Sequence, residues 1–387
     1  MNNMNVFFFT SNRSEYGLLR PLIKALNDTS GFNIKLLVGG SHLLRSYGNT
    51  IDRIIDDGFE IAATFPFLFN DSQLDVLPRS LGVLSAQIGH FFSSNKVDLL
   101  FVLGDRLELI PVVSSAMIMS IPIAHISGGE TTEGAIDNQI RHAITKMSHL
   151  HYPATEYYKE NLLSMGEEVW RICVSGEPGL DQIISMDFIL KEDLYEDIGL
   201  CLDKPVILCT FHPETINNQI SPEFVSNLLS TILDDTNYQL LVTASNFDHG
   251  GPEINEQLDI LSNKHQRISF IQNLGQRRYY SLLRYADLML GNSSSGLVEA
   301  QSFELPAVNV GKRQKGRMAN PNVLDCKCNV DESLKAISAI KQEGFRDRYK
   351  NQQNIYGDGK ASSRIIQHIK DIDWKLLLTK KDNFGTR

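Results

Sequence analysis

Short apolar runs alternate with helix-like segments along the whole chain, and this alternation restricts the folds that the chain can adopt. In the first half, apolar runs of strand length occupy residues 6–10, 33–38, 97–103, 121–126 and 149–153. Between them, residues 15–27, 50–57, 76–94, 108–119 and 137–147 have helical spacing. Strands and helices that alternate in this way form parallel sheets with helices on both faces. Residues 172–175 are expected to form the last strand of this half.

The second half repeats the alternation, with strand-like runs at residues 206–210, 239–244, 268–271, 288–290 and 307–310. Because single cores stop growing at about 250–300 residues, a chain of 387 residues is expected to form two domains. We predict an α/β protein of two Rossmann-like, doubly wound domains with a cleft between them. Glycines and a proline interrupt regular structure at 176–179, so the domains are predicted at 1–176 and 177–361. Residues 362–378 have a helical pattern, and the C-terminal segment 362–387 can cross back to the first domain.

The composition is that of an ordinary globular protein and argues against several classes. The net charge of −9 argues against general affinity for nucleic acid, because a phosphate-binding face needs a surplus of basic residues. No apolar run approaches the roughly 20 residues that span a bilayer, and the N-terminal segment lacks the features of a signal peptide. Five cysteines fit a reducing cytoplasm better than a disulfide framework. The Cys326 and Cys328 pair lacks the second ligand pair of a zinc site. We expect a cytoplasmic protein without a metal site.

A cluster of charged residues lies between apolar runs of the first half. Its members are Asp105, Arg106, Glu130, Asp137 and Arg141. Carboxylates at the ends of buried strands can have pKa values that are moved apart, so that one accepts a proton while another donates one. Arginines beside them could hold a phosphorylated substrate. A single residue of this kind is usually a solvated loop residue, but several after apolar strands favour a site built for charge.

The loop at residues 10–17 follows a strand and precedes a helix, where backbone N–H groups and the helix dipole favour an anion. Arg13 in this loop is predicted to hold a phosphate or carboxylate. Neither the GxGxxG fingerprint nor the Walker lysine pattern is present. A solvated loop with Ser14 as the helix cap would explain the same residues. His42 also ends a strand, which makes it a candidate for ligand contact.

A loop rich in glycine and serine, residues 291–296, follows the apolar run at 288–290 and predicts a phosphate-binding site. Small residues at a helix start let a ligand approach the backbone closely. The candidate contacts are Ser293, Ser294, Ser295 and Gly296. Glu299 either compensates the helix dipole or contacts a ribose diol. His212 ends the first strand of the second half, where a histidine faces the ligand crevice of an open sheet.

Four motifs carry a resemblance to a known family. They read Gly-Asp-Arg at 104–106, His-Ile-Ser-Gly-Gly-Glu at 125–130, Asp-Asn-Gln-Ile-Arg-His-Ala at 137–143 and Gly-Asn-Ser-Ser-Ser-Gly at 291–296. In this order and spacing they resemble the hydrolysing UDP-N-acetylglucosamine 2-epimerases over nearly the whole chain. The likeness is closest to the bacterial sialic-acid biosynthesis branch, including Gly-Ser-His-Leu at 40–43 and Tyr-Gly-Asn-Thr at 47–50. Relatives often carry a second acid where this chain has Asn138, so a proton role is doubtful there.

The resemblance implies the glycosyltransferase-B arrangement of the two domains, with UDP held mainly by the second. It also implies that UDP-N-acetylglucosamine and water become N-acetylmannosamine and UDP, by anti elimination to a glycal and then hydration, without a cofactor. By position, the catalytic residues are Asp105, Glu130, Asp137 and His212. The implied UDP contacts are Arg13, Ser293, Ser294, Glu299 and Arg313, with Arg106 and Arg141 as secondary clamps. Which carboxylate removes the carbon 2 proton stays open, and the family inclines us to expect a homodimer.

Three other functions fit the same residues. A hydrolysing 2-epimerase of UDP-2,4-diacetamido-2,4,6-trideoxyglucose, in a legionaminic-acid pathway, would share every motif and differ in the pocket around carbons 4 and 6. A retaining glycosyltransferase of the same fold would transfer the sugar to an acceptor instead of releasing it to water. A nucleotide-sugar sensor would bind UDP without turnover. Only the epimerases incorporate solvent deuterium at carbon 2.

Overall fold

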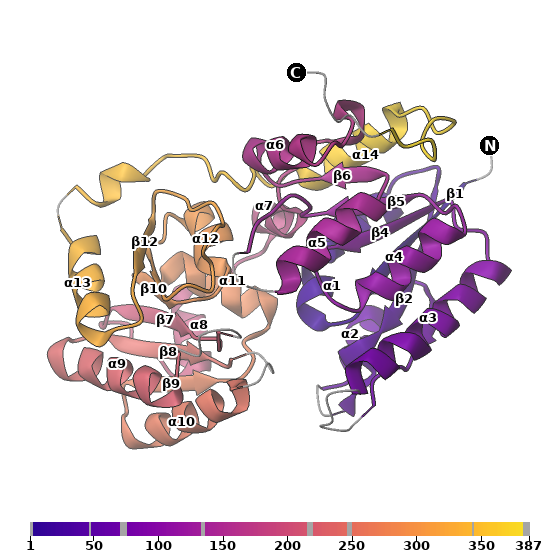
Figure 1. Ribbon diagram of the computed structural model, residues 1–387. Helices are drawn as coiled ribbons and strands as arrows, with labels where there is room; N and C mark the ends of the chain where they lie inside the picture. Colours follow the sequence, from indigo (N-terminus) through magenta and orange to yellow (C-terminus); the bar gives the residue numbers. More distant parts are fainter. Residues whose placement is uncertain are drawn as a thin grey trace. The chain divides into compact units, whose positions relative to one another are not determined.

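The computed structural model describes residues 3–45, 48–69, 76–132, 136–214, 220–245, 250–342 and 344–381. The chain forms two compact units, and each is built on a parallel sheet of six strands (Figure 1). The first unit comprises Met1–Glu130, Ile136–Ile184 and Ile355–Arg387, and the second comprises Thr131–Ala135 and Ser185–Asn354. The predicted α/β class with two doubly wound domains is therefore confirmed. In the motif at 47–50, Tyr47 lies outside the described residues.

The sheet of the first unit has the strand order β3-β2-β1-β4-β5-β6. Its strands are β1 (Met4–Thr10), β2 (Phe32–Gly39), β3 (Ile61–Phe65), β4 (Leu99–Leu103), β5 (Ile123–Ile126) and β6 (Leu150–Tyr152). Its helices are α1 (Arg13–Asn27), α2 (Ile51–Asp56), α3 (Val76–Ser94), α4 (Leu109–Ile118), α5 (Ile136–Met147), α6 (Glu156–Ser164) and α14 (Ala361–Asp371). The strand order reverses between β1 and β4, and ligands of doubly wound sheets bind at the carboxyl ends of the strands beside such a reversal.

Alternate residues of β4 point into the two cores that cover this sheet, as the two-residue period of a strand requires. Leu99 and Phe101 belong to the core that includes α1 and α14. Leu100 and Val102 belong to the core that includes α3, α4 and α5. Every residue of β4 is buried, which explains why this strand is a continuous apolar run in the sequence. Helix α5 is therefore fixed against the sheet by its own apolar face.

The second unit repeats this architecture with the strand order β12-β11-β10-β7-β8-β9. Its strands are β7 (Val206–Thr210), β8 (Gln239–Thr243), β9 (Ile268–Ile271), β10 (Leu288–Gly291), β11 (Ala307–Val310) and β12 (Val323–Cys326). Its helices are α8 (Lys191–Ile198), α9 (Pro222–Asp235), α10 (Gly251–Lys264), α11 (Gly275–Tyr285), α12 (Ser295–Val298) and α13 (Val330–Ile340). Strands β7 and β10 are neighbours at the reversal of strand order. The loops after these two strands thus take the place of the ligand-binding loops of this fold class.

The boundaries between the units differ from those predicted at 176 and 361. The chain leaves the first unit after Ile184, within the short helix α7 (Asp181–Ser185), because the residues before it are bound to α1. Gln182 Nε2, for example, donates to Gly17 O at 2.7 Å. The chain returns at Ile355, where Glu177 N donates to Tyr356 O at 2.7 Å. The terminal helix then lies in the first unit and contributes buried side chains to its core.

Three sequence-based assignments of regular structure were wrong or incomplete. Residues 172–175 do not form a strand, since Ile172 makes only an isolated bridge to His151. Pro153, the first residue after β6, has no N–H to extend the pairing. Strands β3 and β12 were missed because both lie at sheet edges, and the partly exposed residues of β3 carry no strong apolar pattern. The terminal helix ends at Asp371 rather than at residue 378, because Ile372 is already extended.

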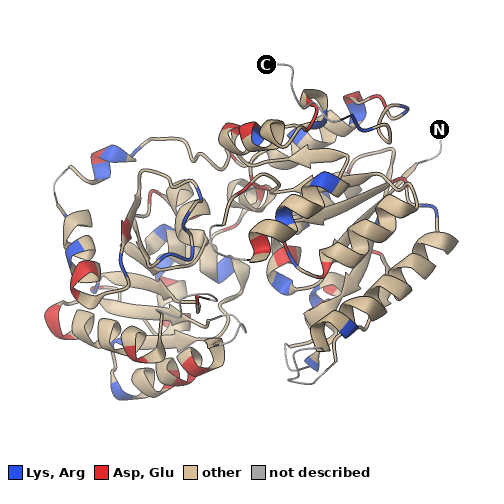
Figure 2. Cartoon of the chain, in the orientation of Figure 1, with Lys and Arg blue, Asp and Glu red and all other residues tan. Residues whose placement is uncertain are grey.

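Charged residues lie mainly on the helices and loops of both units, and the strands carry few of them (Figure 2). Over the described residues, we find no helix with the length and apolar character that a membrane span requires.

Candidate active site

The turn after β5 places Glu130 in the first unit. Ser127 and Gly129 both have a positive φ, of 59° and 79°. A Cβ at Gly129 would lie 2.4 Å from Tyr158 O, and a Cβ at Gly128 would lie 2.9 Å from His125 Nδ1. Two glycines are therefore required by the close packing of this turn. The turn ends at Glu130, which is buried.

Arg141 on α5 connects two of the predicted carboxylates. Its side chain is 1% exposed and forms an ion pair with Asp105, which follows β4. Arg141 Nη2 also lies 4.0 Å from Glu130 Oε2. A guanidinium in such a place is strongly coupled to its carboxylates, because removing either partner leaves a buried charge uncompensated. Arg141 thus holds together acids that come from the ends of two adjacent strands.

The other two members of the charged cluster lie differently. Asp137 is exposed and precedes Arg141 by four residues, so both belong to the same face of α5. Arg106 is half exposed and its Nη2 lies 3.3 Å from Glu108 Oε1. The structure therefore brings Asp105, Glu130 and Arg141 into contact distance and places Asp137 one helical turn away.

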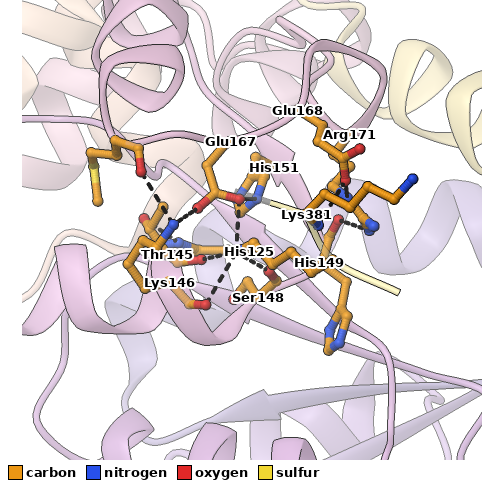
Figure 3. A network of polar contacts seen from close by, with 12 residues as sticks. His125, Thr145, Lys146, Ser148, His149, His151, Glu167, Glu168, Arg171 and Lys381 are labelled. Carbon is orange, nitrogen blue, oxygen red and sulfur yellow. Dashed lines mark hydrogen bonds and ion pairs between the residues drawn. The ribbon is translucent and has the colours of Figure 1, made fainter. Parts of the chain in front are cut away.

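A buried histidine of β5, which was not predicted as a site residue, contacts both the loop before Asp105 and helix α5. His125 Nε2 lies 2.8 Å from Gly104 O, directly before Asp105, and His125 Nδ1 lies 3.2 Å from Thr145 Oγ1 on α5 (Figure 3). Burial lowers the pKa of His125 to about 3, so the ring is neutral near pH 7. A neutral ring that donates from Nε2 to a carbonyl must accept at Nδ1 from the threonine hydroxyl. The only sequence signal was its place in the motif at 125–130.

Asn12, and not Ser14, is the N-cap of helix α1, which follows the first loop of this unit. The Asn12 side chain accepts a hydrogen bond from Glu15 N at 3.0 Å, which makes Asn12 the N-cap of α1. Arg13 is the first residue of that helix and is partly buried. Burial, and then the nearby Arg53, lower the pKa of Arg13. The predicted anion-binding cation thus stands at the helix start, as expected.

Two buried titratable residues form hydrogen bonds with this loop. Glu15 Oε2 accepts hydrogen bonds from Ser11 N at 2.7 Å and from Ser11 Oγ at 3.1 Å, while its Oε1 is buried and has no partner among the described residues. Burial raises the pKa of Glu15 to about 7. His42 is fully buried, and its two ring nitrogens lie 3.1 Å from Thr10 Oγ1 and 2.8 Å from Thr50 Oγ1. In this structure His42 supports the loop through both nitrogens.

In the second unit, Gly291 and Asn292 shape the loop after β10. Gly291 has a φ of 137°, and a Cβ there would lie 1.9 Å from Thr210 O on the adjacent strand. Asn292 is fully buried, accepts from His212 N and donates to His212 O, both at 2.7 Å. Arg313 Nη1 donates to Asn292 O at 3.1 Å. Asn292, which was part of a predicted motif but not a predicted site residue, thus fixes His212 and Arg313 to one loop.

His212 is electrically neutral at this position. Burial, and then the charge of Arg313, lower the pKa of His212 to about 3. A neutral imidazole can donate a hydrogen bond to an anion or accept a proton. His212 and Arg313, which were predicted separately, are thus both bonded to Asn292.

The serine-rich loop itself is followed by less helix than the sequence suggests. The apolar helix that begins after this loop, α12, is a single turn, Ser295–Val298, and a short 3-10 turn follows it. Ser293 and Gly296 line a small hollow between β10 and β11. Burial raises the pKa of Glu299, and Glu299 Oε2 has no partner among the described residues.

No group of three or more histidine, cysteine, aspartate or glutamate side chains within the described ranges is arranged to hold a metal ion. The five cysteines are free thiols, and Cys326 and Cys328 are both partly buried.

The chain has two doubly wound sheets. One carries acids held by a buried arginine, and the other carries a glycine-rich loop beside a neutral histidine. These features define a class of two-domain Rossmann-like enzymes. The family model for UDP-N-acetylglucosamine 2-epimerase matches residues 24–370, and the chain belongs to this family. The resemblance drawn from the motifs is thereby confirmed.

Three known proteins illustrate this membership. The chain is 34% identical to a GDP/UDP-N,N'-diacetylbacillosamine 2-epimerase (hydrolyzing) of Campylobacter jejuni, with 88% of each chain covered. It is also 34% identical to a UDP-N,N'-diacetylbacillosamine 2-epimerase (hydrolyzing) of Legionella pneumophila, with 95% of this chain and 96% of the relative covered. The structure of UDP-GlcNAc 2-epimerase from Neisseria meningitidis bound to UDP-GlcNAc superimposes with a TM-score of 0.83 at 16% identity, covering 95% of this chain and 100% of that one. This last likeness shows the fold.

Proposed function

We propose that the chain is a hydrolysing 2-epimerase that releases UDP from a UDP-activated 2-acetamido sugar and inverts carbon 2. The observation that carries the proposal is the contact of Arg141 with Asp105 and Glu130 at the ends of β4 and β5. Epimerisation needs a proton to leave one face of carbon 2 and another to arrive on the opposite face. Carboxylates are suited to both steps when their environments differ.

The proposed reaction has two steps. A base removes the carbon 2 proton while the bond from carbon 1 to the UDP oxygen breaks, UDP leaves with the electron pair, and a glycal forms. Water then adds its hydroxyl to carbon 1, and an acid delivers a proton to the other face of carbon 2. Asp105, Glu130 and Asp137 are proposed for these proton transfers, and which of them acts as the base stays open.

The departing UDP is proposed to bind the groups gathered in the second unit. Arg313 and the neutral His212 suit the diphosphate, together with the loop at 291–296. Glu299 suits the ribose hydroxyls, because its buried Oε2 has no hydrogen-bond partner in the described part of the chain. Arg13 of the first unit is proposed as a further phosphate contact. Fixed charges and dipoles of this kind stabilise a leaving anion without reorganising during the reaction.

Two substrates are proposed for the sugar. The motifs imply UDP-N-acetylglucosamine, with N-acetylmannosamine as the product, in sialic-acid biosynthesis. The two relatives at 34% identity favour UDP-N,N'-diacetylbacillosamine instead, which is UDP-2,4-diacetamido-2,4,6-trideoxyglucose. The two sugars differ at carbons 4 and 6, away from the carbon that reacts, so the same acids serve both.

The test is to incubate purified protein with each nucleotide sugar in D2O and to measure UDP release and the mass of the free sugar. A hydrolysing 2-epimerase incorporates one deuteron at carbon 2, whereas a glycosyltransferase or simple hydrolase leaves that position unlabelled. The substrate with the larger kcat/KM is the physiological candidate. UDP release without deuterium at carbon 2 from either sugar would refute the proposal. The expected cytoplasmic homodimer is a further proposal, and light scattering after gel filtration measures its mass.

A further inference from the structure

A fully buried carboxylate lies beside the C-terminal end of α5. Glu167 follows α6, and neither its side chain nor that of His151 on β6 has any exposed surface. His151 Nε2 lies 2.9 Å from Glu167 Oε2, and Lys146 Nζ of α5 lies 2.9 Å from Glu167 Oε1 (Figure 3). Burial raises the pKa of Glu167, but the contacts with His151 and then with Lys380 outweigh it and lower the pKa to about 2. Glu167 is therefore an ionised centre to which α5 is attached.

A residue far along the chain completes this centre. Lys380 Nζ lies 2.7 Å from Glu167 Oε2. The same ammonium group donates to the carbonyl oxygens of Thr145, Lys146 and Ser148, at 3.4, 3.1 and 2.9 Å. The last carbonyl groups of a helix have no partner inside the helix and carry its negative partial charge. Lys380 thus caps α5 with a cation that comes from the C-terminal segment.

That segment is itself fixed by a buried arginine. Arg171 Nη1 donates to Leu377 O at 2.7 Å, and Arg171 Nη2 donates to Thr379 O at 2.9 Å. The Arg171 side chain has no exposed surface, and Leu377 is part of the core that includes α1. Lys380 is consequently held in place by its own neighbours and does not depend on Glu167 alone.

The capped end of α5 is connected to the candidate active site. Asp137, Arg141 and Thr145 follow one another at four-residue intervals and share a face of α5. Thr145 Oγ1 bonds to His125, and His125 bonds to Gly104 O, directly before Asp105. His125 and His151 are also paired across β5 and β6. A shift of α5 along its axis would therefore displace Arg141 and the support of Asp105 together.

We propose that Lys380 is a positioning residue for the reaction, which acts through Glu167 and the end of α5 on Arg141 and Asp105. The proposal rests on the proposed function, because it gives these two residues their role. Small displacements of reacting groups have large effects on turnover and little effect on binding made elsewhere. The C-terminal segment thus contributes to catalysis without touching the substrate.

The experiment compares Lys380→Met, which keeps the aliphatic stem and removes the charge, with Lys381→Met. Lys381 is exposed, and its contact with Glu168 uses the backbone N–H, so its side chain serves as a matched control. We expect Lys380→Met to lower kcat per folded molecule by about tenfold, with affinity for UDP unchanged and faster hydrogen exchange of the α5 amides. Lys380→Arg, which keeps the cation, should recover most of the turnover. Thr145→Val should lower kcat in the same way, because it breaks the bond to His125.

Wild-type kcat in folded Lys380→Met, with only a lower melting temperature, would overturn the inference and leave a purely structural role. Unchanged hydrogen exchange of α5 in that variant would overturn it as well. Wild-type protein that turns over neither nucleotide sugar would refute the proposed function instead. The exchange measurement needs no activity and would then still decide whether Lys380 fixes α5.

Discussion

Replacing Glu15 by glutamine should make the protein more stable at alkaline pH. Glu15 is 3% exposed, and burial raises its pKa from 4.5 to about 7. The folded protein therefore binds this proton more tightly than the unfolded chain does. The stabilisation is complete below the unfolded pKa and is lost as the pH rises through the folded one. At roughly 1.4 kcal/mol per pKa unit, the loss amounts to about 3 kcal/mol.

Glutamine resembles the protonated carboxyl, since its oxygen can accept the bonds from Ser11 and it carries no charge. The two proteins should have similar stability at pH 5, and Glu15→Gln should be more stable by up to about 3 kcal/mol at pH 8. Urea unfolding followed by tryptophan fluorescence measures the stability of the unit that contains Glu15, because Trp170 and Trp374 both belong to the first unit. Glu156→Gln, at a largely exposed side chain, is the control.

One outcome of this comparison would contradict the raised pKa of Glu15. Stability curves of wild type and Glu15→Gln that run parallel from pH 5 to pH 8 would show that Glu15 is ionised throughout. The hydrogen bonds from Ser11 and the charge of Arg106 lower the pKa of Glu15, whereas burial and Glu108 raise it. Parallel curves would mean that the Ser11 hydrogen bonds and Arg106 together outweigh burial and Glu108.

Three further predictions concern the acid cluster of the first unit and the glycine-rich loop of the second unit. Removing one proposed proton-transfer group should lower turnover by orders of magnitude, while calorimetry should show nearly unchanged UDP affinity. Near-normal turnover in all three of the following variants would contradict the assignment. The variants are Asp105→Asn, Glu130→Gln and Asp137→Asn. Arg141→Met should destabilise the first unit by about 3–5 kcal/mol, measured by urea unfolding, because it leaves the buried Glu130 and the partly buried Asp105 without their cation. Gly291→Ala should weaken UDP binding in calorimetry, since its Cβ would strike Thr210 O, whereas Gly17→Ala, with open space around it, should bind UDP normally.

The sequence predicted the acids of the site but not the contacts among them. Asp105 and Glu130 could be placed because each follows a continuous apolar run, and such runs become adjacent buried strands. Arg141 could be placed on a helix, but its partners depend on how that helix rotates against the sheet. The sequence therefore suggested a phosphate clamp, whereas the structure shows Arg141 engaged with carboxylates.

The supporting networks were beyond sequence reasoning for a different reason. His42 gains its partners from Thr10 and Thr50, and Glu167 gains one from Lys380, more than two hundred residues away. No local pattern marks such residues, because each is an ordinary polar residue until the chain brings the others to it. His125 is a buried polar residue within the apolar strand β5, and its place in the motif at 125–130 was the only signal for it in the sequence.

The second unit is inserted between two parts of the first, and this has a consequence for synthesis. Residues 185–354 form an unbroken segment that contains all six strands of their sheet. The core of the first unit, in contrast, needs Ile365, Ile369 and Leu377, which emerge from the ribosome after the second unit. Domains generally fold as units while the chain is made. The unit that is begun first is therefore completed last, because one of the two cores on its sheet lacks these side chains until the second unit has been made.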